Sequence, residues 1–249
     1  MADNMTRFFA APADIAENTI HLSDENAAHI RSLRLRPDEL FIVCDGLGKD
    51  HVCHLGDRDD SGSIAEIVET RPSRGEPKIY CVVFIAFAKG DRLDYATQKS
   101  VELGARKITL FPSERCISLS DIITKKTARL QKIALEAAKQ SGRGCIPRVT
   151  AADTFDAAIG LAAHAGLSLF FYEHEEKLHL KQVLQQHDPT QPPNSVSIVT
   201  GPEGGFTPQE AALARSSGLV QVTLGPRILR CETAPAAALA AIMYHTGNL

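Results

Sequence analysis

Two stretches near the C-terminal end combine glycines with charged side chains in a pattern that suits ligand binding. The first, Gly201–Phe206, reads Gly-Pro-Glu-Gly-Gly-Phe, and the second, Leu224–Ala234, reads Leu-Gly-Pro-Arg-Ile-Leu-Arg-Cys-Glu-Thr-Ala. Glycine lets the backbone approach a ligand closely and leaves its amide groups able to bind it. Arg227, Arg230 and Glu232 add charge to the second stretch. Together the stretches predict one ligand site, although two tight strand-to-helix turns would also explain the glycines.

The signatures of several common chemistries are missing. The sequence contains no G-x-x-x-x-G-K-[ST] motif and no G-x-G-x-x-G between a predicted strand and helix. No serine has the context of a nucleophile elbow. His51 with His54, and His174 with His179, lack a cysteine at metal-ligand spacing. Nucleotide hydrolysis, the usual dinucleotide fold, triad hydrolysis and a metal site are therefore poor explanations.

The elements around the two stretches predict how they are held. Residues 195–200 and 220–224 are predicted strands that run into them, and Thr207–Glu210 has the pattern of a helix start. The long apolar run 78–87 is typical of a strand buried on both faces, and 124–141 has apolar residues at helical spacing. Strands that alternate with helices predict an α/β fold with a mostly parallel sheet. Ligands bind at the carboxyl ends of such strands, where both stretches begin.

The N-terminal part has a different spacing of predicted elements. Short strands are predicted at 7–9, 19–22, 39–44, 51–55 and 63–68, with a helix after Ser23. This spacing favours a small β-barrel or sheet. The Pro- and Gly-containing stretch 71–77 is the predicted linker. We therefore expect domains at 1–73 and 74–249.

Composition and charge limit where the protein works and what it binds. Six scattered cysteines without a C-x-x-C motif favour reduced thiols in the cytoplasm. No apolar run approaches the roughly 18 residues of a membrane span, and no signal pattern opens the sequence. The formal charge is −3, but residues 89–148 contain 13 basic and 6 acidic side chains. That excess permits a nucleic-acid partner, and a solvated helical face explains it equally well.

The motifs as a set resemble those of one family. The chain resembles the RsmE family of 16S ribosomal RNA uridine-N3 methyltransferases, in the SPOUT (trefoil-knot) superfamily. The matching blocks are Arg7–Phe9, His29–Ile30 with Leu33–Leu35, Gln98–Gly104, Ser113–Cys116, Gln140–Arg143 with Ile146–Pro147, Gly201–Phe206 and Leu224–Ala234. Gly-Pro-Glu-Gly-Gly alone is common to the superfamily, whereas the last block with the Glu-Leu-Gly and Gln-Ser-x-Arg blocks makes the match specific. Cys231 stands where a threonine is expected in some relatives.

The resemblance implies a fold, a cofactor and partners. It implies a PUA-like β-barrel that binds RNA at 1–73, and a trefoil-knot α/β domain at 74–249 that binds S-adenosylmethionine. A homodimer acting on 16S ribosomal RNA in the 30S subunit is implied as well. The expected cofactor-binding residues are Leu169, Phe171, Thr200, Gly201, Gly205, Leu224, Gly225, Ile228, Leu229 and Thr233.

The implied reaction suggests roles for charged residues. Methylation at N3 removes a weakly acidic proton and gains from a base or from stabilisation of developing negative charge. Arg230 is the first candidate for that stabilisation, and Glu203 and Glu232 compete as the base, although either could only tie down a loop. The candidates for RNA phosphate contact are Arg7, Arg115, Lys125, Lys126, Arg129 and Arg143.

Two other functions remain open at this point. One is a SPOUT methyltransferase that acts on tRNA or on another ribosomal RNA site, for example at a ribose oxygen. The other is a non-catalytic RNA-binding protein of ribosome assembly, which the intact glycine stretches disfavour. For each apolar residue of the expected cofactor site, ordinary core packing is an equally good explanation.

Overall fold

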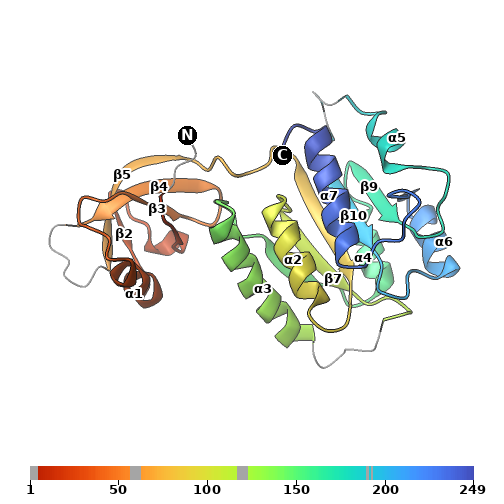
Figure 1. Ribbon diagram of the computed structural model, residues 1–249, viewed down its shortest axis with the longest axis horizontal. Helices are drawn as coiled ribbons and strands as arrows, with labels where there is room; N and C mark the ends of the chain where they lie inside the picture. Colours follow the sequence, from red (N-terminus) through yellow and green to blue (C-terminus); the bar gives the residue numbers. More distant parts are fainter. Residues whose placement is uncertain (1–4, 57–62, 117–122, 189–190, 192) are drawn as a thin grey trace. The chain divides into compact units, whose positions relative to one another are not determined.

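The computed structural model describes residues 5–56, 63–116, 123–188, 191 and 193–249. The chain divides into two units, one formed by Met1–Glu76 with Ala138–Ile146 and the other by Pro77–Ala137 with Pro147–Leu249 (Figure 1). The predicted boundary at residue 73 lies close to Glu76. The membership of residues 138–146 in the first unit was not predicted, because nothing in their sequence distinguishes them from the rest of the second.

The first unit is built on a five-stranded sheet in the order β1-β3-β4-β5-β2. Its strands are β1 (Arg7–Phe9), β2 (Thr19–His21), β3 (Phe41–Cys44), β4 (Lys49–Leu55) and β5 (Ile64–Pro72). β1 runs parallel to β3, and the other neighbours are antiparallel. A register shift between Val52 and Cys53 interrupts the β4–β5 ladder, and such irregularities bend a sheet. The sheet curls into a half-barrel, which confirms the predicted PUA-like unit.

Helix α1 (Asp24–Leu33) covers the core of this unit. Ser23 is its N-cap and accepts a hydrogen bond from the Asn26 amide at 3.3 Å, as the sequence predicts. A short 3-10 helix, η1, spans Pro12–Asp14. The buried core consists of Phe8, Ile20, Leu22, Ile30, Phe41, Val43, Cys53 and Ala65. β5 continues to Pro72, so the predicted linker 71–77 is wrong at its start.

The second unit contains a six-stranded sheet in the order β11-β9-β10-β6-β7-β8, and every pair of neighbours is parallel. Its strands are β6 (Tyr80–Ala86), β7 (Lys107–Phe111), β8 (Arg148–Ala151), β9 (Leu167–Phe171), β10 (Ser195–Thr200) and β11 (Val220–Val222). The predicted parallel α/β sheet is confirmed. The short edge strand β8 was not predicted, because its four residues carry no distinctive apolar run.

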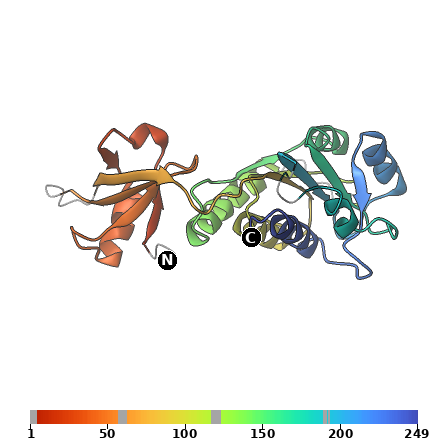
Figure 2. The ribbon, with the colours of Figure 1, turned by 90° about the horizontal axis from the view of Figure 1, so that it is seen from above.

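Helices cover both faces of this sheet. They are α2 (Arg92–Glu102), α3 (Ile123–Gln140), α4 (Phe155–Ala162), α5 (Leu180–Leu184), α6 (Pro208–Ser216) and α7 (Thr233–His245). α7 packs against α2 and contacts β6 and β10, whereas α4 contacts α6 and the same two strands. Figure 2 shows α7, in dark blue, and α4, in green, on opposite sides of the sheet. Phe84, Phe111, Phe170 and Phe206 form the aromatic centre of the buried core on the α4 side.

Candidate active site

Three loops meet at the carboxyl ends of the neighbouring strands β11, β9 and β10. Residues from 171–176, 200–205 and 222–234 supply most of the lining of a cavity of about 1020 Å³. The two glycine-containing stretches therefore line one cavity, where the parallel-sheet argument placed them.

The glycines of the first loop are required by the loop's own packing. A Cβ on Gly201 would lie 3.1 Å from a ring carbon of Phe206. Gly205 has a φ of +67°, and a side chain on it would collide with the Glu173 carboxylate. That carboxylate accepts a hydrogen bond from the Phe206 amide at 2.9 Å. The backbone of the loop is thus drawn against β9 and the core, which shapes one wall of the cavity.

Both ends of this loop are anchored. The buried Thr200 hydroxyl donates to the carbonyl of Phe84 on β6 at 3.3 Å. At the other end, Thr207 and Glu210 form the predicted capping box at the start of α6, with amide-to-side-chain distances of 2.8 and 3.2 Å. The loop between them is therefore positioned before any ligand arrives.

Arg92, in the first turn of α2, joins the two glycine-containing loops. Its guanidinium pairs with Glu203 of the first loop, and its Nε lies 3.8 Å from Glu232 of the second. Glu203 also accepts a hydrogen bond from the Lys89 amide at 2.8 Å. Three segments distant in sequence are thereby tied together at the edge of the cavity.

The environment of these groups shifts their protonation. Burial acts to raise the pKa of Glu203, but hydrogen bonds from the Lys89 amide and its own amide, with the Arg92 guanidinium, outweigh it, and the pKa lies below its ordinary value. Burial raises the pKa of the neighbouring Cys231 thiol to about 12, helped by its hydrogen bond to Glu232 at 3.2 Å. At neutral pH Glu203 is therefore a carboxylate and Cys231 a neutral thiol.

Most residues expected to hold a cofactor line this cavity. Those that do are Phe171, Thr200, Gly201, Gly205, Leu224, Gly225, Ile228 and Leu229. Ile228 is 86% exposed, which is unusual for an isoleucine that only packs in a core. The second loop thus presents apolar surface to the cavity without burying it.

Two of the expected cofactor residues are not in the lining: the expectation for Leu169 is corrected, and that for the exposed Thr233, between the lining residues Glu232 and Ala234, stays a prediction. Leu169 is fully buried in β9, with β10 and β11 on its two sides, so it belongs to the core and does not line the cavity. Thr233 begins α7, where its amide donates to the Arg230 carbonyl at 2.9 Å, and it also lies outside the lining.

The three residues expected to take part in chemistry are brought together. Arg230, Glu203 and Glu232 all line the cavity. Arg230 is exposed to solvent, whereas the two carboxylates are tied to Arg92. An exposed cation therefore stands at the cavity beside two ordered carboxylates.

A second cavity of about 760 Å³ adjoins the first. It brings together the four basic residues Arg115, Lys125, Lys126 and Arg129, which the sequence assigned to RNA contact. Arg92, Arg115, Glu203 and Gly204 line both cavities.

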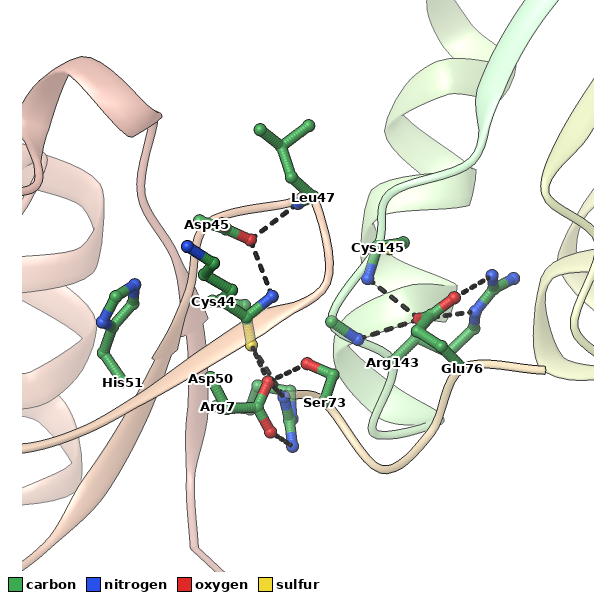
Figure 3. Close-up of polar contacts among 12 residues, drawn as sticks. Arg7, Cys44, Asp45, Leu47, Asp50, His51, Ser73, Glu76, Arg143 and Cys145 are labelled. Atoms are coloured by element: carbon green, nitrogen blue, oxygen red, sulfur yellow. Dashed lines mark hydrogen bonds and ion pairs between the residues drawn. The ribbon is translucent and has the colours of Figure 1, made fainter. Parts of the chain in front are cut away.

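The structure corrects the expectation that Arg7 and Arg143 present their charges to RNA. Arg143 is 2% exposed and holds Glu76 by two hydrogen bonds, at 2.7 and 3.2 Å. Glu76 Oε1, which accepts the longer of these two bonds, also accepts hydrogen bonds from the amides of Gly144 and Cys145 (Figure 3). Arg143 therefore fastens residues 138–146 to the first unit.

The Arg7 side chain is also held by a carboxylate of the first unit. It pairs with Asp50 through both terminal nitrogens, at 2.7 and 3.0 Å, and Asp50 also accepts the Ser73 hydroxyl (Figure 3). Burial acts to raise the pKa of Asp50, but its bonds to Arg7 and Ser73 outweigh this and hold the pKa below its ordinary value. The guanidinium thus joins β1 to β4 within the sheet.

Sequence reasoning missed three residues of the site. Arg92 and Lys89 were not singled out, because a charge at a helix start has no signature of its own. Glu173, which holds the Gly205 turn, was missed because nothing in the sequence distinguishes it from the other acidic residues that follow β9. In the described part of the chain, no three His, Cys, Asp or Glu side chains gather as a metal site.

The fold and this site match a known class of domain. A family model described as an RNA methyltransferase domain covers residues 75–243. The second unit, with its parallel sheet and its cavity at three strand ends, is therefore an RNA methyltransferase domain.

Individual relatives extend the match to the whole chain. The ribosomal RNA small subunit methyltransferase E of Synechocystis is 34% identical, over 95% of this chain and 76% of the relative. The Bacillus subtilis protein of that name is 32% identical, over 92% and 91%. The crystal structure of the Neisseria gonorrhoeae protein, bound to S-adenosyl methionine, matches with a TM-score of 0.83 at 33% identity, over 96% of this chain and 97% of that one.

The chain belongs to the ribosomal RNA small subunit methyltransferase E (RsmE) family, as the sequence motifs predicted. Within the residues described, no helix has both the length and the apolar character to cross a membrane.

Proposed function

We propose that this protein transfers a methyl group from S-adenosylmethionine to N3 of a uridine in 16S ribosomal RNA. The observation that carries the proposal is the cavity at the ends of β9, β10 and β11, which gathers Arg230, Glu203 and Glu232 beside an apolar, glycine-containing wall. Family membership gives this arrangement its reaction class. The related Neisseria gonorrhoeae structure, which is bound to S-adenosyl methionine, supports the choice of cofactor.

The residues of the cavity fit that cofactor. Small-molecule sites usually enclose about 300–1,000 Å³ and combine apolar walls with a few polar groups. Here Phe171, Leu224 and Leu229 offer apolar surface to the adenine and the methionine chain. The carboxylates of Glu173, Glu175, Glu176, Glu203 and Glu232 in the lining suit the positive sulfonium and amino groups. When bound, the cofactor supplies an electrophilic methyl group on positively charged sulfur.

Arg230 is assigned the stabilisation of negative charge on the uracil. Loss of the N3 proton leaves that charge on the base, and a cation at its edge lowers the barrier. Arg230 is suitable because it is exposed at the cavity. Removal of one such stabilising group typically costs about 2.7–4 kcal/mol in the transition state.

Glu232 is the better of the two candidates for the base. Glu203 is occupied by Arg92 and the Lys89 amide, and its lowered pKa makes it a weak proton acceptor. Glu232 has a longer contact with Arg92, at 3.8 Å. We therefore assign Glu203 to holding the first loop and Glu232 to accepting the N3 proton.

The proposal includes the chain's path, partners and location. β10 lies between β9 and β6 although β7 and β8 precede it in sequence, which is compatible with the knotted path of the SPOUT superfamily.

Tyr95 and Tyr244, on the adjacent helices α2 and α7, are 49% and 79% exposed and suit the interface of a homodimer. The substrate would be the 30S subunit or its 16S RNA. Six free cysteines suit a cytoplasmic location.

Methyl transfer with mapping of the product tests the proposal. Purified protein is incubated with labelled S-adenosylmethionine and 30S subunits, or naked 16S RNA, that lack the modification. The methylated nucleotide is then identified by mass spectrometry. We expect label at N3 of one uridine, and absence of transfer to both substrates would refute the proposal.

Product mapping and a separate binding measurement distinguish the two alternative functions. A modified ribose oxygen, or label only in tRNA, would identify a different RNA methyltransferase. Binding to 30S subunits without S-adenosylmethionine binding in calorimetry would identify a non-catalytic assembly protein. The carboxylates that line the cavity suit the positively charged cofactor, which favours an enzyme that binds S-adenosylmethionine over a non-catalytic assembly protein.

A further inference from the structure

The second cavity is strongly basic. Four segments line it: the loop after β6 with the first turn of α2, the loop after β7, the first turns of α3, and the loop after β10. Its basic residues are Lys89, Arg92, Arg115, Lys125, Lys126 and Arg129. Among the described residues in its lining, Glu203 is the one carboxylate. Such a concentration of positive charge in a concave surface attracts anions.

Two of these cations are held in place by neutral groups, whereas Arg92 and Arg129 pair with the carboxylates of Glu203 and Asp94. Lys126 donates to the carbonyl of Ala88 at 2.9 Å, and Arg115 donates to the carbonyl of Gly204 at 2.7 Å. These carbonyls orient the side chains without neutralising their charge. Burial lowers the pKa of Lys126, while the Asp94 and Glu203 carboxylates act to raise it and Arg129 acts to lower it.

The position of this cavity connects it to the reaction. Arg92 and Arg115 line both cavities, as do Glu203 and Gly204, so the two cavities share a wall. An anion in the basic cavity would therefore lie directly beside the proposed cofactor cavity. A nucleotide whose base enters the cofactor cavity carries its phosphates within reach of this wall.

We propose that the basic cavity binds backbone phosphates of the RNA next to the target nucleotide. This inference rests on the proposed function and deepens it by naming where the RNA chain lies. Phosphate contacts position a nucleic acid without reading its sequence. Lys125, Lys126 and Arg115 hold the strand so that the base between the phosphates faces Arg230 and Glu232. The cavity is thus a positioning site.

Salt dependence of RNA binding tests the proposal. Each phosphate neutralised on a single strand contributes about 0.7 to the slope of log affinity against log salt concentration. If Lys125 and Lys126 each contact one phosphate, the K125Q/K126Q variant should show a slope smaller by about 1.4. Its loss of RNA affinity relative to the unaltered protein should then be about 25-fold greater at 0.1 M salt than at 1 M salt. The probes are naked 16S RNA and 30S subunits that lack the modification, so binding is measured whether or not the protein methylates them.

Matched controls isolate the cavity. Lys132 is an exposed lysine on the same helix outside the cavity lining, so K132Q should change the slope by less than either single variant, K125Q or K126Q. Calorimetry with S-adenosylmethionine should give the same affinity for K125Q/K126Q as for the unaltered protein. Equal slope changes in K132Q and K125Q would overturn the proposal, because they would indicate a diffuse basic face. Unchanged RNA affinity in K125Q/K126Q would overturn it as well.

A competition experiment distinguishes RNA phosphates from a small anion. Inorganic phosphate should displace the RNA no better than chloride at equal ionic strength. Micromolar binding of inorganic phosphate that is lost in K125Q/K126Q, without effect on RNA binding, would show a small-anion site and overturn the proposal. Failure of the unaltered protein to transfer methyl groups would refute the proposed function instead, and it is read out separately from these binding measurements.

Discussion

Arg92 in the first turn of α2 pairs with Glu203 in the loop after β10, and the two residues lie 111 positions apart in the chain. The guanidinium also reaches Glu232 in the loop after β11, with its Nε 3.8 Å from the carboxylate. One side chain therefore joins two of the three loops that line the cavity. Because Arg92 also lines the basic cavity, it lies where RNA and cofactor would meet.

Substitution of Arg92 should impair turnover more than folding. In Arg92→Ala the two loops lose their common partner, and a displacement of about 1 Å at a reacting centre can cost about 100-fold in rate. Arg92→Lys keeps the charge but lacks the planar fork, so it should restore only part of the activity. Methyl-transfer kinetics and thermal unfolding are measured side by side. The control is Lys99→Ala, which removes a local ion pair on the same helix, and equal kinetics in both variants would contradict this role.

Gly205 should be intolerant of a side chain for two separable reasons. Its φ of +67° is unfavourable for alanine, and a Cβ would displace the Glu173 carboxylate. Gly247 has a φ of +66° but nothing within 4 Å of its Cβ position, so Gly247→Ala carries only the backbone strain, about 1–2 kcal/mol. We expect Gly205→Ala to weaken S-adenosylmethionine binding at least about tenfold, which is 1.4 kcal/mol. Calorimetry should show no change in Gly247→Ala, and equal affinities would mean that Glu173 does not shape the cavity.

The parts of the fold and site that sequence patterns predicted are those with local physical causes. Apolar runs such as 78–87 form strands because both faces are buried, and Thr207 to Glu210 caps α6 through neighbouring residues alone. Contacts across the sheet have no local pattern. Arg143 resembled a surface arginine in a basic segment, but its partner Glu76 lies 67 positions away. The burial of Leu169 could not be predicted either, because only the strand order shows that β10 and β11 flank it.

Breaking the Arg143–Glu76 pair should destabilise the first unit strongly. Removing one partner of a buried ion pair costs about 3–5 kcal/mol, because the other charge is left uncompensated. Arg143→Ala should therefore lose that much free energy of unfolding, and Glu76→Gln, which keeps the shape but leaves the buried Arg143 guanidinium uncompensated, should lose a similar amount. The control is Lys99→Ala, because the Lys99–Glu102 pair is only partly buried, with its side chains 32% and 24% exposed, and pairs that solvent reaches are worth about 0–1 kcal/mol. Chemical denaturation measures all three, and a loss in Arg143→Ala no larger than in Lys99→Ala would contradict the structural role.

Arg230 should act in turnover and little in cofactor affinity. Its assigned partner is the negative charge on the uracil, which exists only as the reaction proceeds. Arg230→Ala should therefore lower the rate constant for methyl transfer by about 2.7–4 kcal/mol, or roughly 100- to 1,000-fold. Single-turnover kinetics gives the rate and calorimetry gives the cofactor affinity. Unchanged turnover would remove Arg230 from the catalytic residues.

The two carboxylates can be distinguished by their pH dependence. The folded-state pKa of Glu203 lies below its ordinary value of 4.5, so its pairing with Arg92 is fully present above that value and is lost as pH falls through the lowered pKa. Glu203 should therefore stay ionised from pH 5 to 9 and contribute no step to the rate profile there. Glu203→Gln should lower the rate by a constant factor across this range.

Glu232→Gln should behave differently if Glu232 accepts the N3 proton. Without the base, transfer depends on uridine ionised in solution, so the rate should rise about tenfold per pH unit below the pKa of the N3–H group, because the ionised fraction does. The unaltered protein should show a weaker dependence. Single-turnover rates of both variants from pH 6 to 9 make the comparison. A steep pH dependence in Glu203→Gln but not in Glu232→Gln would reverse the assignment, and parallel profiles for all three proteins would mean that neither carboxylate takes the proton.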